Sequence, residues 1–282
     1  MSEIPPIVVQ QVSYMYPGRR RGTEPSAAAL HDVSLRVAPG EYVAVVGRNG
    51  SGKSTLARLC TALLAPDAGR VLVAGMDTRD PSLRQAIREH VGIVFQNPDN
   101  QIIATVVEDD VAWALAIRGW PAAQIRERVA WALAATGIAD LRALPPHRLS
   151  GGQRQRLAIA GVLALRPQAI IADEATALLD PLSRGELVAL LRQLNQEHGL
   201  TIIHITHLLE EATRAHRMVV LDRGQIALEG TPPAIFADLE RLRQLDLAIP
   251  EPIELAARLR TVGMPLSPQA LTPEAIAREI AR

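Results

Sequence analysis

With 282 residues, of which 48% are hydrophobic, the chain is long enough to form one large domain, or one domain with an extension, around a substantial core. Its thirty basic residues balance its thirty acidic ones, so it lacks the basic bias typical of nucleic-acid-binding proteins. No apolar run approaches the roughly 18 to 20 residues of a membrane-spanning helix, and the start lacks the pattern of a signal peptide, so we expect a cytoplasmic protein.

An antiparallel hairpin is expected first. Apolar and polar residues alternate over residues 7–14, and residues 30–37 are predicted to form the returning strand. The polar loop between them contains three arginines at residues 19–21, the only local basic cluster, which we interpret as part of a solvated loop. Tyr16 lies shortly before this loop, where its ring could stack on a nucleobase or pack within the sheet.

The next segment, GRNGSGKST at residues 47–55, fits the pattern G-x-x-x-x-G-K-[S/T]. It falls between a predicted buried strand at 42–46 and a predicted helix at 54–63, so its glycines lie at a strand-to-helix turn. There the backbone can curl until several N–H groups point at one phosphate, and the helix N-terminus adds a partial positive charge. The residues of this expected phosphate site are Gly47, Asn49, Gly50, Ser51, Gly52, Lys53, Ser54 and Thr55.

Two side chains of this segment carry its chemistry. The Lys53 ammonium can reach the outer phosphates, and the Ser54 hydroxyl can hold Mg²⁺. Lys53 is the only lysine in the chain, which marks a position where a compact ammonium on a flexible stem is needed rather than a guanidinium. The apolar face of the predicted helix is expected to be buried and consists of Leu56, Leu59, Cys60 and Leu63. We interpret its cysteine, the single one in the chain, as a packing residue.

Strands and helices alternate in the middle of the chain. Strands are predicted at 69–73 and 91–95, with a helix at 81–89 between them. The polar segment 96–101 is expected to be a loop without a core. Over residues 106–137 the apolar spacing is helical, with one break at a Gly-Trp-Pro sequence, which predicts a helical insertion.

A second glycine pair opens a predicted helix at 154–165. Ser150 is expected to be its N-cap, and Gly151 and Gly152 would let an anion approach the first N–H groups beside Gln153. One nucleotide does not need two such sites in one chain. We therefore interpret this second site as serving a nucleotide held by another subunit, the alternative being an ordinary glycine-bearing helix start.

Two carboxylates end the next predicted strand, at 169–174. Charges at the tip of a buried strand need a partner or a role, and ligands of open parallel sheets lie at the carboxyl ends of the strands. Asp173 could therefore hold Mg²⁺, and Glu174 could reach an attacking water. Because successive side chains of a strand point to opposite sides, the two carboxylates could have different roles.

A further strand and helix are predicted beyond these carboxylates. Asp180 directly precedes a predicted helix at 181–196. His207 follows a predicted β-branched strand at 201–205, where it could hydrogen-bond a γ-phosphate or the attacking water.

A small hairpin, with strands at 217–222 and 225–229, is predicted to close the main body. Beyond it the sequence changes to short helical pieces broken by prolines. We therefore expect a main domain over residues 1–230, with a helical subdomain at about 97–165, and a C-terminal extension over 231–282.

In this order the segments resemble the nucleotide-binding subunit of an ATP-binding cassette (ABC) transporter over about residues 7–230. The resemblance implies an α/β P-loop NTPase fold with an N-terminal antiparallel β subdomain, a RecA-like parallel-sheet core and a helical insertion. It also implies that two such domains meet head to tail, each ATP lying between the Walker A loop of one and the signature of the other. The matched positions are Walker A at 47–54, the Q-loop at Gln96, the signature at 149–153, Walker B with the catalytic glutamate at 170–174, the D-loop at Asp180, the switch histidine at His207 and the adenine-stacking position at Tyr16.

Three features make the resemblance more specific, to one subfamily of ABC ATPases. The segment FQNPDNQ at 95–101 and the tail after residue 230 are similar to the ATPases of energy-coupling factor importers, which take up vitamins and metal ions. Ala175 stands where proline is usual, and Ala177 and Leu178 replace the usual Ser-Ala of the D-loop, as in the first of two non-identical ATPases. This implies a heterodimer with a second ATPase, or else a homodimer, at the cytoplasmic face of the cell membrane. The other implied partners are a transmembrane coupling protein and a substrate-binding membrane component, and the extension could help pair the ATPases.

By the same resemblance the chain hydrolyses ATP. Glu174 would polarise the attacking water, while His207 and Lys53 stabilise charge on the γ-phosphoryl group. ATP would close the dimer and hydrolysis would reopen it. The implied Mg²⁺ ligands are Ser54, Gln96 and Asp173.

Three other functions compete with this one. A cassette ATPase acting on DNA or ribosomes usually has coiled-coil insertions or two fused cassettes, which this chain lacks. A regulatory subunit that binds ATP without hydrolysing it is disfavoured because every catalytic position is filled. An ordinary cassette importer or exporter would share the ATPase mechanism but have different membrane partners.

Overall fold

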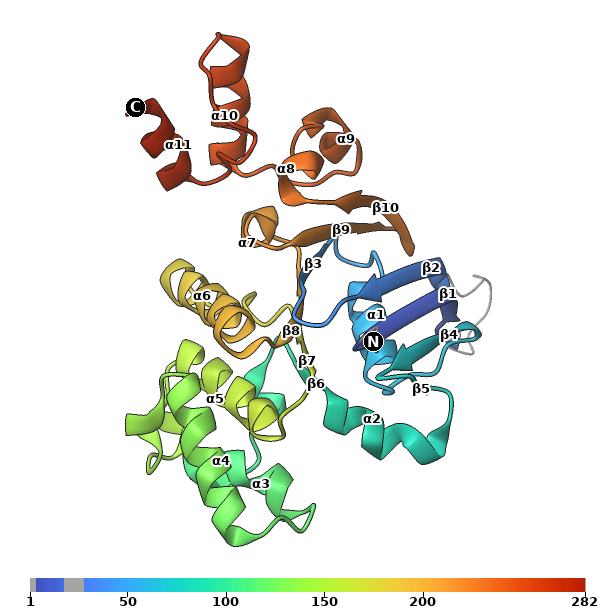
Figure 1. The fold of residues 1–282 in the computed structure, drawn as a ribbon, viewed down its shortest axis with the longest axis vertical. Coiled ribbons are helices and arrows are strands. Elements are labelled where there is room, and N and C mark those ends of the chain that lie inside the picture. Colours follow the sequence, from blue (N-terminus) through green and yellow to red (C-terminus); the bar gives the residue numbers. More distant parts are fainter. Residues whose placement is uncertain (1–3, 18–27, 282) are drawn as a thin grey trace.

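The computed structural model describes residues 4–17 and 28–281, which form two β-sheets and the helices around them (Figure 1). The smaller sheet is antiparallel, in the order β2-β1-β4-β5. It contains the predicted N-terminal hairpin, and the strand predicted at 69–73 lies beside β1 in it. Its strands are β1 (Ile7–Met15), β2 (Ala28–Val37), β4 (Ala68–Val73) and β5 (Met76–Asp77).

The larger sheet has six strands in the order β10-β9-β3-β8-β7-β6. All pairings are parallel except that of β10, an antiparallel edge strand. Every residue of β3, β7 and β8 is buried, as expected for central parallel strands covered on both faces. The six strands are β3 (Tyr42–Val46), β6 (Val91–Val94), β7 (Ala169–Asp173), β8 (Thr201–Thr206), β9 (Arg217–Asp222) and β10 (Gln225–Gly230).

Two cores cover the faces of this sheet. Along β3, Val43 and Val45 pack with α1 and the antiparallel sheet, whereas Tyr42, Ala44 and Val46 pack with α6 on the opposite face. The alternation places the first helix and the N-terminal sheet in one layer. The helices that follow the antiparallel strands or connect the parallel ones are α1 (Lys53–Cys60), α2 (Arg84–His90), α6 (Pro181–His198) and α7 (Leu209–Ala212).

The predicted helical insertion forms a third core of its own. Its helices are α3 (Val107–Ala116), α4 (Ala122–Ala135) and α5 (Gly151–Ala164), which lie together at one end of the molecule (Figure 1). The chain leaves α3 through Gly119, at φ +70°, and Pro121 precedes α4, which accounts for the predicted break. Single 3₁₀ turns occur at Pro81–Leu83, Pro98–Asn100, Ala139–Leu141 and Pro146–Arg148.

The C-terminal segment is helical, as predicted. Phe236, Leu242 and Leu247 join the core that also contains α6, whereas Ala256 and Ile276 belong to a small separate core. The segment therefore packs partly on the main body and partly on itself. Its helices are α8 (Pro232–Ile235), α9 (Leu239–Gln244), α10 (Glu251–Thr261) and α11 (Pro273–Ile280).

The first helix is shorter than predicted. It ends at Cys60, and Ala62 at φ +51° turns the chain, so Leu63 is 44% exposed and its predicted burial was wrong. Leu56, Leu59 and Cys60 are buried as predicted. Burial raises the pKa of the Cys60 thiol to about 12, in keeping with a packing residue.

Other short features also depart from the expectations. Pro98 is buried although no core was expected at 96–101, because the Asn97 side chain caps a 3₁₀ turn that folds the proline inward. The elements β5 and α7 were not predicted. The arginines at 19–21 lie outside the described residues. Within the part that the structure describes, no helix is long and apolar enough to cross a membrane.

Candidate phosphate-binding and catalytic site

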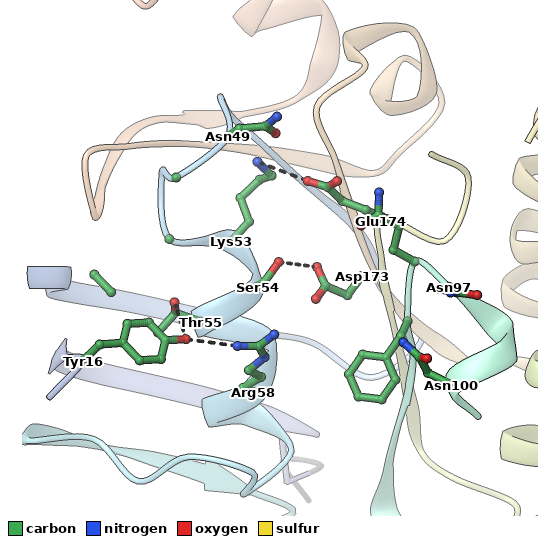
Figure 2. A pocket seen from close by; sticks show the side chains of 15 residues that line it. Tyr16, Asn49, Lys53, Ser54, Thr55, Arg58, Asn97, Asn100, Asp173 and Glu174 are labelled. Carbon is green, nitrogen blue, oxygen red and sulfur yellow. Dashed lines mark hydrogen bonds and ion pairs between the residues drawn. The ribbon is translucent and has the colours of Figure 1, made fainter. Parts of the chain in front are cut away.

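A cavity of about 890 Å³ lies beside the N-terminus of α1, at the carboxyl ends of the parallel strands (Figure 2). Its walls come from segments that are distant in sequence and that the order of strands in the sheet brings together. The lining residues are Tyr16, Ala29, Asn49, Gly50, Gly52, Lys53, Ser54, Thr55, Arg58, Phe95, Gln96, Asn97, Asn100, Asp173 and Glu174.

The turn between β3 and α1 needs glycine at two positions. At Gly52, φ is +105° and a Cβ would lie 2.4 Å from the carbonyl oxygen of Ala29. At Gly47 a Cβ would lie 2.2 Å from the carbonyl oxygen of Leu221. Gly47 and the buried Ser51 do not line the cavity but shape the turn behind it. The close backbone contacts therefore hold the loop curled around the cavity.

Lys53 is the first residue of α1 and is only 4% exposed. Its Nζ donates hydrogen bonds to the carbonyl oxygens of Gly47 (2.7 Å) and Arg48 (2.9 Å) and lies 3.6 Å from Glu174 Oε1. Burial lowers the pKa of the ammonium, while the nearby carboxylates of Glu174 and Asp173 oppose that shift. A positive charge is thus held in the wall of the cavity by oxygen atoms on three sides.

Ser54 and Asp173 place two oxygen ligands side by side. The Ser54 hydroxyl donates to Asp173 Oδ1 at 2.9 Å, and both residues line the cavity (Figure 2). Burial raises the pKa of Asp173, while the Ser54 hydrogen bond and the charge of Lys53 act in the opposite direction. Gln96 lines the same cavity. Hydroxyl, carboxylate and amide oxygens are hard ligands, so this donor set fits Mg²⁺.

Glu174 does not lie on the strand, contrary to the expectation that strand alternation separates it from Asp173. The strand β7 ends at Asp173, and Glu174 has φ +51°, with its N–H bonded to the carbonyl oxygen of Ile205 at 3.0 Å. This backbone turn, costly for a non-glycine residue, directs the carboxylate. Its oxygens lie 3.6 Å from Lys53 Nζ and 3.8 Å from His207 Nδ1. His207 itself does not line the cavity.

Tyr16 lies at the other end of the cavity. Its hydroxyl is 3.3 Å from Thr55 Oγ1 and accepts a hydrogen bond from Arg58 Nη1 at 3.2 Å (Figure 2). The ring of Tyr14 packs edge-to-face against it, with centroids 5.0 Å apart. These contacts orient the Tyr16 ring. Tyr16 lines the cavity and is 38% exposed.

Several lining residues were not predicted. Arg58 lies one helical turn after Ser54, a spacing that could have indicated it. Asn97 and Asn100 follow Gln96 in a loop that the sequence analysis treated as a unit, without assigning roles to them. Ala29 comes from a different sheet, and no sequence signal pointed to it.

The second predicted anion site does not join this cavity. Ser150 caps α5 as predicted: its hydroxyl accepts from the Gln153 N–H (3.2 Å) and its N–H donates to Gln153 Oε1 (2.8 Å). Asp180 caps α6, accepting from the N–H groups of Leu182 and Ser183. The predicted binding residues that lie outside the cavity at α5 and α6 are Ser150, Gly151, Gly152, Gln153 and Asp180.

Comparisons with known proteins identify the family of the chain. A family model described as "ABC transporter" matches residues 30–177. The "Energy-coupling factor transporter ATP-binding protein EcfA1" of Symbiobacterium thermophilum is 51% identical, over 95% of this chain and 94% of that protein. The protein of the same description from Caldanaerobacter subterraneus subsp. tengcongensis is 44% identical, over 98% of this chain and 99% of its own length.

Solved structures show the same fold. The structure of cbiO1 from Clostridium perfringens, described as part of the ABC transporter complex cbiONQ, has a TM-score of 0.76 and 35% identity, covering 90% of this chain and all of that one. The dimeric cassette MJ0796 in a post-hydrolysis state, bound to ADP and Pi, has a TM-score of 0.70 and 30% identity, covering 80% of this chain and 98% of that one.

Proposed function

The chain belongs to the ABC transporter family, among the energy-coupling factor ATPases of the EcfA1 type, and from this premise we propose how its residues bind and hydrolyse ATP and what they power. As a member of that group it is an ATPase subunit of an energy-coupling factor transporter. One observation carries the assignment of its catalytic residues. The Glu174 carboxylate lies between Lys53 Nζ and His207 Nδ1 at the edge of a cavity lined by the phosphate loop.

The phosphates of ATP bind in the curled loop between β3 and α1. Asn49, Gly50 and Gly52 of this loop line the cavity together with the N-terminus of α1, and a phosphate oxygen can replace the backbone carbonyls as the partner of the Lys53 ammonium. Ser54, Asp173 and Gln96 would hold Mg²⁺. When bound, that ion would neutralise charge on the β- and γ-phosphates.

Glu174 orients and polarises the attacking water. Its carboxylate stays close to the ammonium of Lys53, and the imidazole of His207 is 3.8 Å away, within reach of a γ-phosphate or of the same water. Lys53 and His207 stabilise the charge that develops on the transferred phosphoryl group. Tyr16, held by Tyr14 and Arg58, stacks on the adenine.

Ser150, Gly151, Gly152, Gln153 and Asp180 serve the nucleotide of a second subunit. The support is their position at the N-termini of α5 and α6, outside the cavity that holds this chain's own nucleotide. Backbone N–H groups at such a terminus bind phosphate well. The dimeric cassettes among the similar structures favour the same arrangement.

The expected assembly is a heterodimer with a second ATPase at the cytoplasmic face of the membrane, bound to a transmembrane coupling protein and a substrate-binding membrane component. This assembly is supported by the EcfA1 relatives, which are energy-coupling factor proteins by name, and by cbiO1, which is described as part of a larger transporter complex. The transported substrate would be a vitamin or a transition-metal ion. In this proposal residues 1–230 form the ATP-binding cassette, and 231–282 help pair the two ATPases.

A single variant tests both mechanism and partners. A tagged Glu174→Gln chain should bind ATP yet hydrolyse it very slowly, because the amide keeps the size of the side chain but cannot take up the proton. Gentle solubilisation of native membranes and mass spectrometry should then recover a second ATPase and small membrane proteins. Normal turnover would refute the role of Glu174, and recovery of a conventional permease would refute the subfamily partners.

A further inference from the structure

A buried polar cluster lies inside the sheet, next to the catalytic edge but outside the cavity. At its centre is His204 on β8, which is fully buried. The residues beside it in register are Ala44 on β3 and Ala172 on β7. Because both neighbours are small, the imidazole has room on that face of an otherwise apolar sheet.

Tyr42 lies at one end of this cluster. Its hydroxyl is 3.0 Å from His204 Nδ1, and burial raises the pKa of Tyr42, so the phenol remains protonated and can donate to the ring. The other ring nitrogen of His204 is Nε2. That atom lies 3.2 Å from Glu211 Oε2.

Glu211, on the short helix α7, lies at the other end and is 5% exposed. The Thr176 hydroxyl donates to the same Oε2 atom at 3.0 Å. Burial alone would raise the pKa of Glu211, but interactions with His204, Thr206 and Thr176 outweigh it and lower the pKa. The carboxylate is therefore ionised inside the protein, held by groups from three chain segments.

Two of these segments present the catalytic side chains. Thr176 follows Glu174 by two residues, and Thr206 directly precedes His207. The second oxygen of Glu211, Oε1, faces Arg184 Nε at 3.9 Å. Arg184 also donates to the carbonyl oxygen of Leu179, directly before Asp180. One buried carboxylate thus joins the segment from Glu174 to Asp180 to the segment that ends in His207.

We propose that Glu211 is a positioning residue for ATP hydrolysis, which fixes the segment carrying Glu174 relative to the segment carrying His207. The inference rests on the roles proposed above for those two residues. A buried charge that loses one of its few partners is strongly destabilised, so the segments bound to Glu211 cannot shift independently. The contacts of Glu211 thereby determine the distance between the Glu174 carboxylate and His207 Nδ1, which is 3.8 Å in the structure.

The test compares Glu211→Gln with Glu210→Gln in the assembled transporter. Glu210 is the exposed neighbour on the same helix, so its variant controls for loss of one charge at that place. For Glu211→Gln we expect kcat for ATP to fall by about tenfold to a hundredfold, because small misplacements of reacting groups cost this much. KM for ATP should stay within about twofold, since the phosphate loop is untouched. The Glu210 variant should match the unmodified protein.

A second variant separates positioning from a general loss of structure. Thr176→Val removes only the hydroxyl that holds Glu211, and it should also lower kcat; the double variant should be no slower than Glu211→Gln, because both act through one contact. Rates are divided by the number of ATP-binding sites measured with a non-hydrolysable analogue. Unchanged kcat per site in both variants would overturn the inference.

Different results would refute the catalytic role of Glu174 and the positioning role of Glu211. Normal turnover by Glu174→Gln would refute the catalytic assignment itself. Slow turnover by Glu174→Gln together with normal turnover by Glu211→Gln and Thr176→Val would leave that assignment intact and remove only the positioning role. If Glu211→Gln does not fold, the comparison of Thr176→Val with the unmodified protein decides the inference.

Discussion

The single lysine of the chain occupies a space that accepts only a compact cation. Its Nζ lies between two backbone carbonyl oxygens, at 2.7 and 2.9 Å, with a carboxylate oxygen at 3.6 Å. An ammonium can direct its three protons to such a set and later to phosphate oxygens. A guanidinium is planar and larger, and its donors are fixed in a fork.

We therefore expect Lys53→Arg to bind ATP more weakly although the charge is kept. The loss of one charged hydrogen bond costs about 1.5–3 kcal/mol, which raises the Kd for ATP by at least about tenfold. Arg48→Lys, the opposite exchange in the same loop, is the control: Arg48 is exposed, pairs with Asp246, and its exchange should leave the Kd unchanged. Fluorescent-nucleotide titration measures both. Equal affinities for ATP in all three proteins would contradict this account of Lys53.

Most of the residues that line the cavity could be predicted from the sequence. The buried residue that contacts the segments carrying the catalytic side chains could not. Lys53, Ser54 and Asp173 belong to contiguous motifs with a known spacing, so pattern alone indicated them. Glu211 was not found, because its neighbours Thr176, Arg184 and His204 come from three other segments and share no local pattern with it. Only the folded chain brings them together.

At the scale of the elements, one close contact fixes how α5 lies on the edge of the large sheet. Gly92 on β6 faces Val162 on α5, and a Cβ at position 92 would lie 2.0 Å from Val162 Cγ1. A branched valine cannot turn away as a flexible side chain would. The helix that carries Ser150 at its N-terminus therefore depends on a glycine in a strand.

Gly92→Ala should lower the stability of the protein by about 1–3 kcal/mol, because overpacking forces the helix and strand apart. Val162→Ala should restore part of the loss in the double variant, since it removes the clashing methyl groups. Gly161→Ala is the control on the same helix: nothing lies within 4 Å of its Cβ, and alanine favours helix. Denaturant unfolding measures all four proteins. Additive losses in the double variant would contradict the proposed contact.

Most elements could be predicted from their patterns, and the exceptions have local causes. The strands at 42–46 and 217–222 were predicted with the observed ends, since each is a short valine-containing run with a glycine turn after it. The helix after Lys53 was predicted three residues too long, because its sequence stays apolar past the turn at Ala62. Short elements such as β5 and α7 have too few residues to show a period.

At the scale of the whole molecule, the two surfaces that we propose to bind phosphate do not meet within one chain. The loop after β3 lines the cavity, whereas Ser150, the N-cap of α5, and Gly151, its first residue, lie outside the cavity at the helical subdomain. A site built from both surfaces needs two chains. ATP binding by the isolated chain should then depend on the loop after β3 alone, whereas turnover by the assembly should also depend on the residues at the N-terminus of α5.

Gly151→Asp separates the two activities. A Cβ at this position would meet only Leu179 Cδ2, at 3.6 Å, and an acidic residue in the first turn of a helix is favourable, so the variant should fold. The new carboxylate would nevertheless repel a γ-phosphate brought by the partner subunit. We expect the isolated chain to keep its Kd for ATP, while turnover of the assembled transporter falls by about tenfold or more.

Gly151→Asn is the matched control, because asparagine has nearly the same size as aspartate and no charge, so turnover should remain well above that of the aspartate variant. Salt provides a second check. If repulsion between charges is the cause, raising the ionic strength should recover part of the Gly151→Asp activity and leave the Asn variant unaffected. An equal loss of turnover in both variants would mean that the size of the new side chain, and not its charge, disturbs the site near α5. Loss of ATP binding by the isolated Gly151→Asp chain would show that this helix start serves the chain's own nucleotide, which would remove the reason for two chains to share each site.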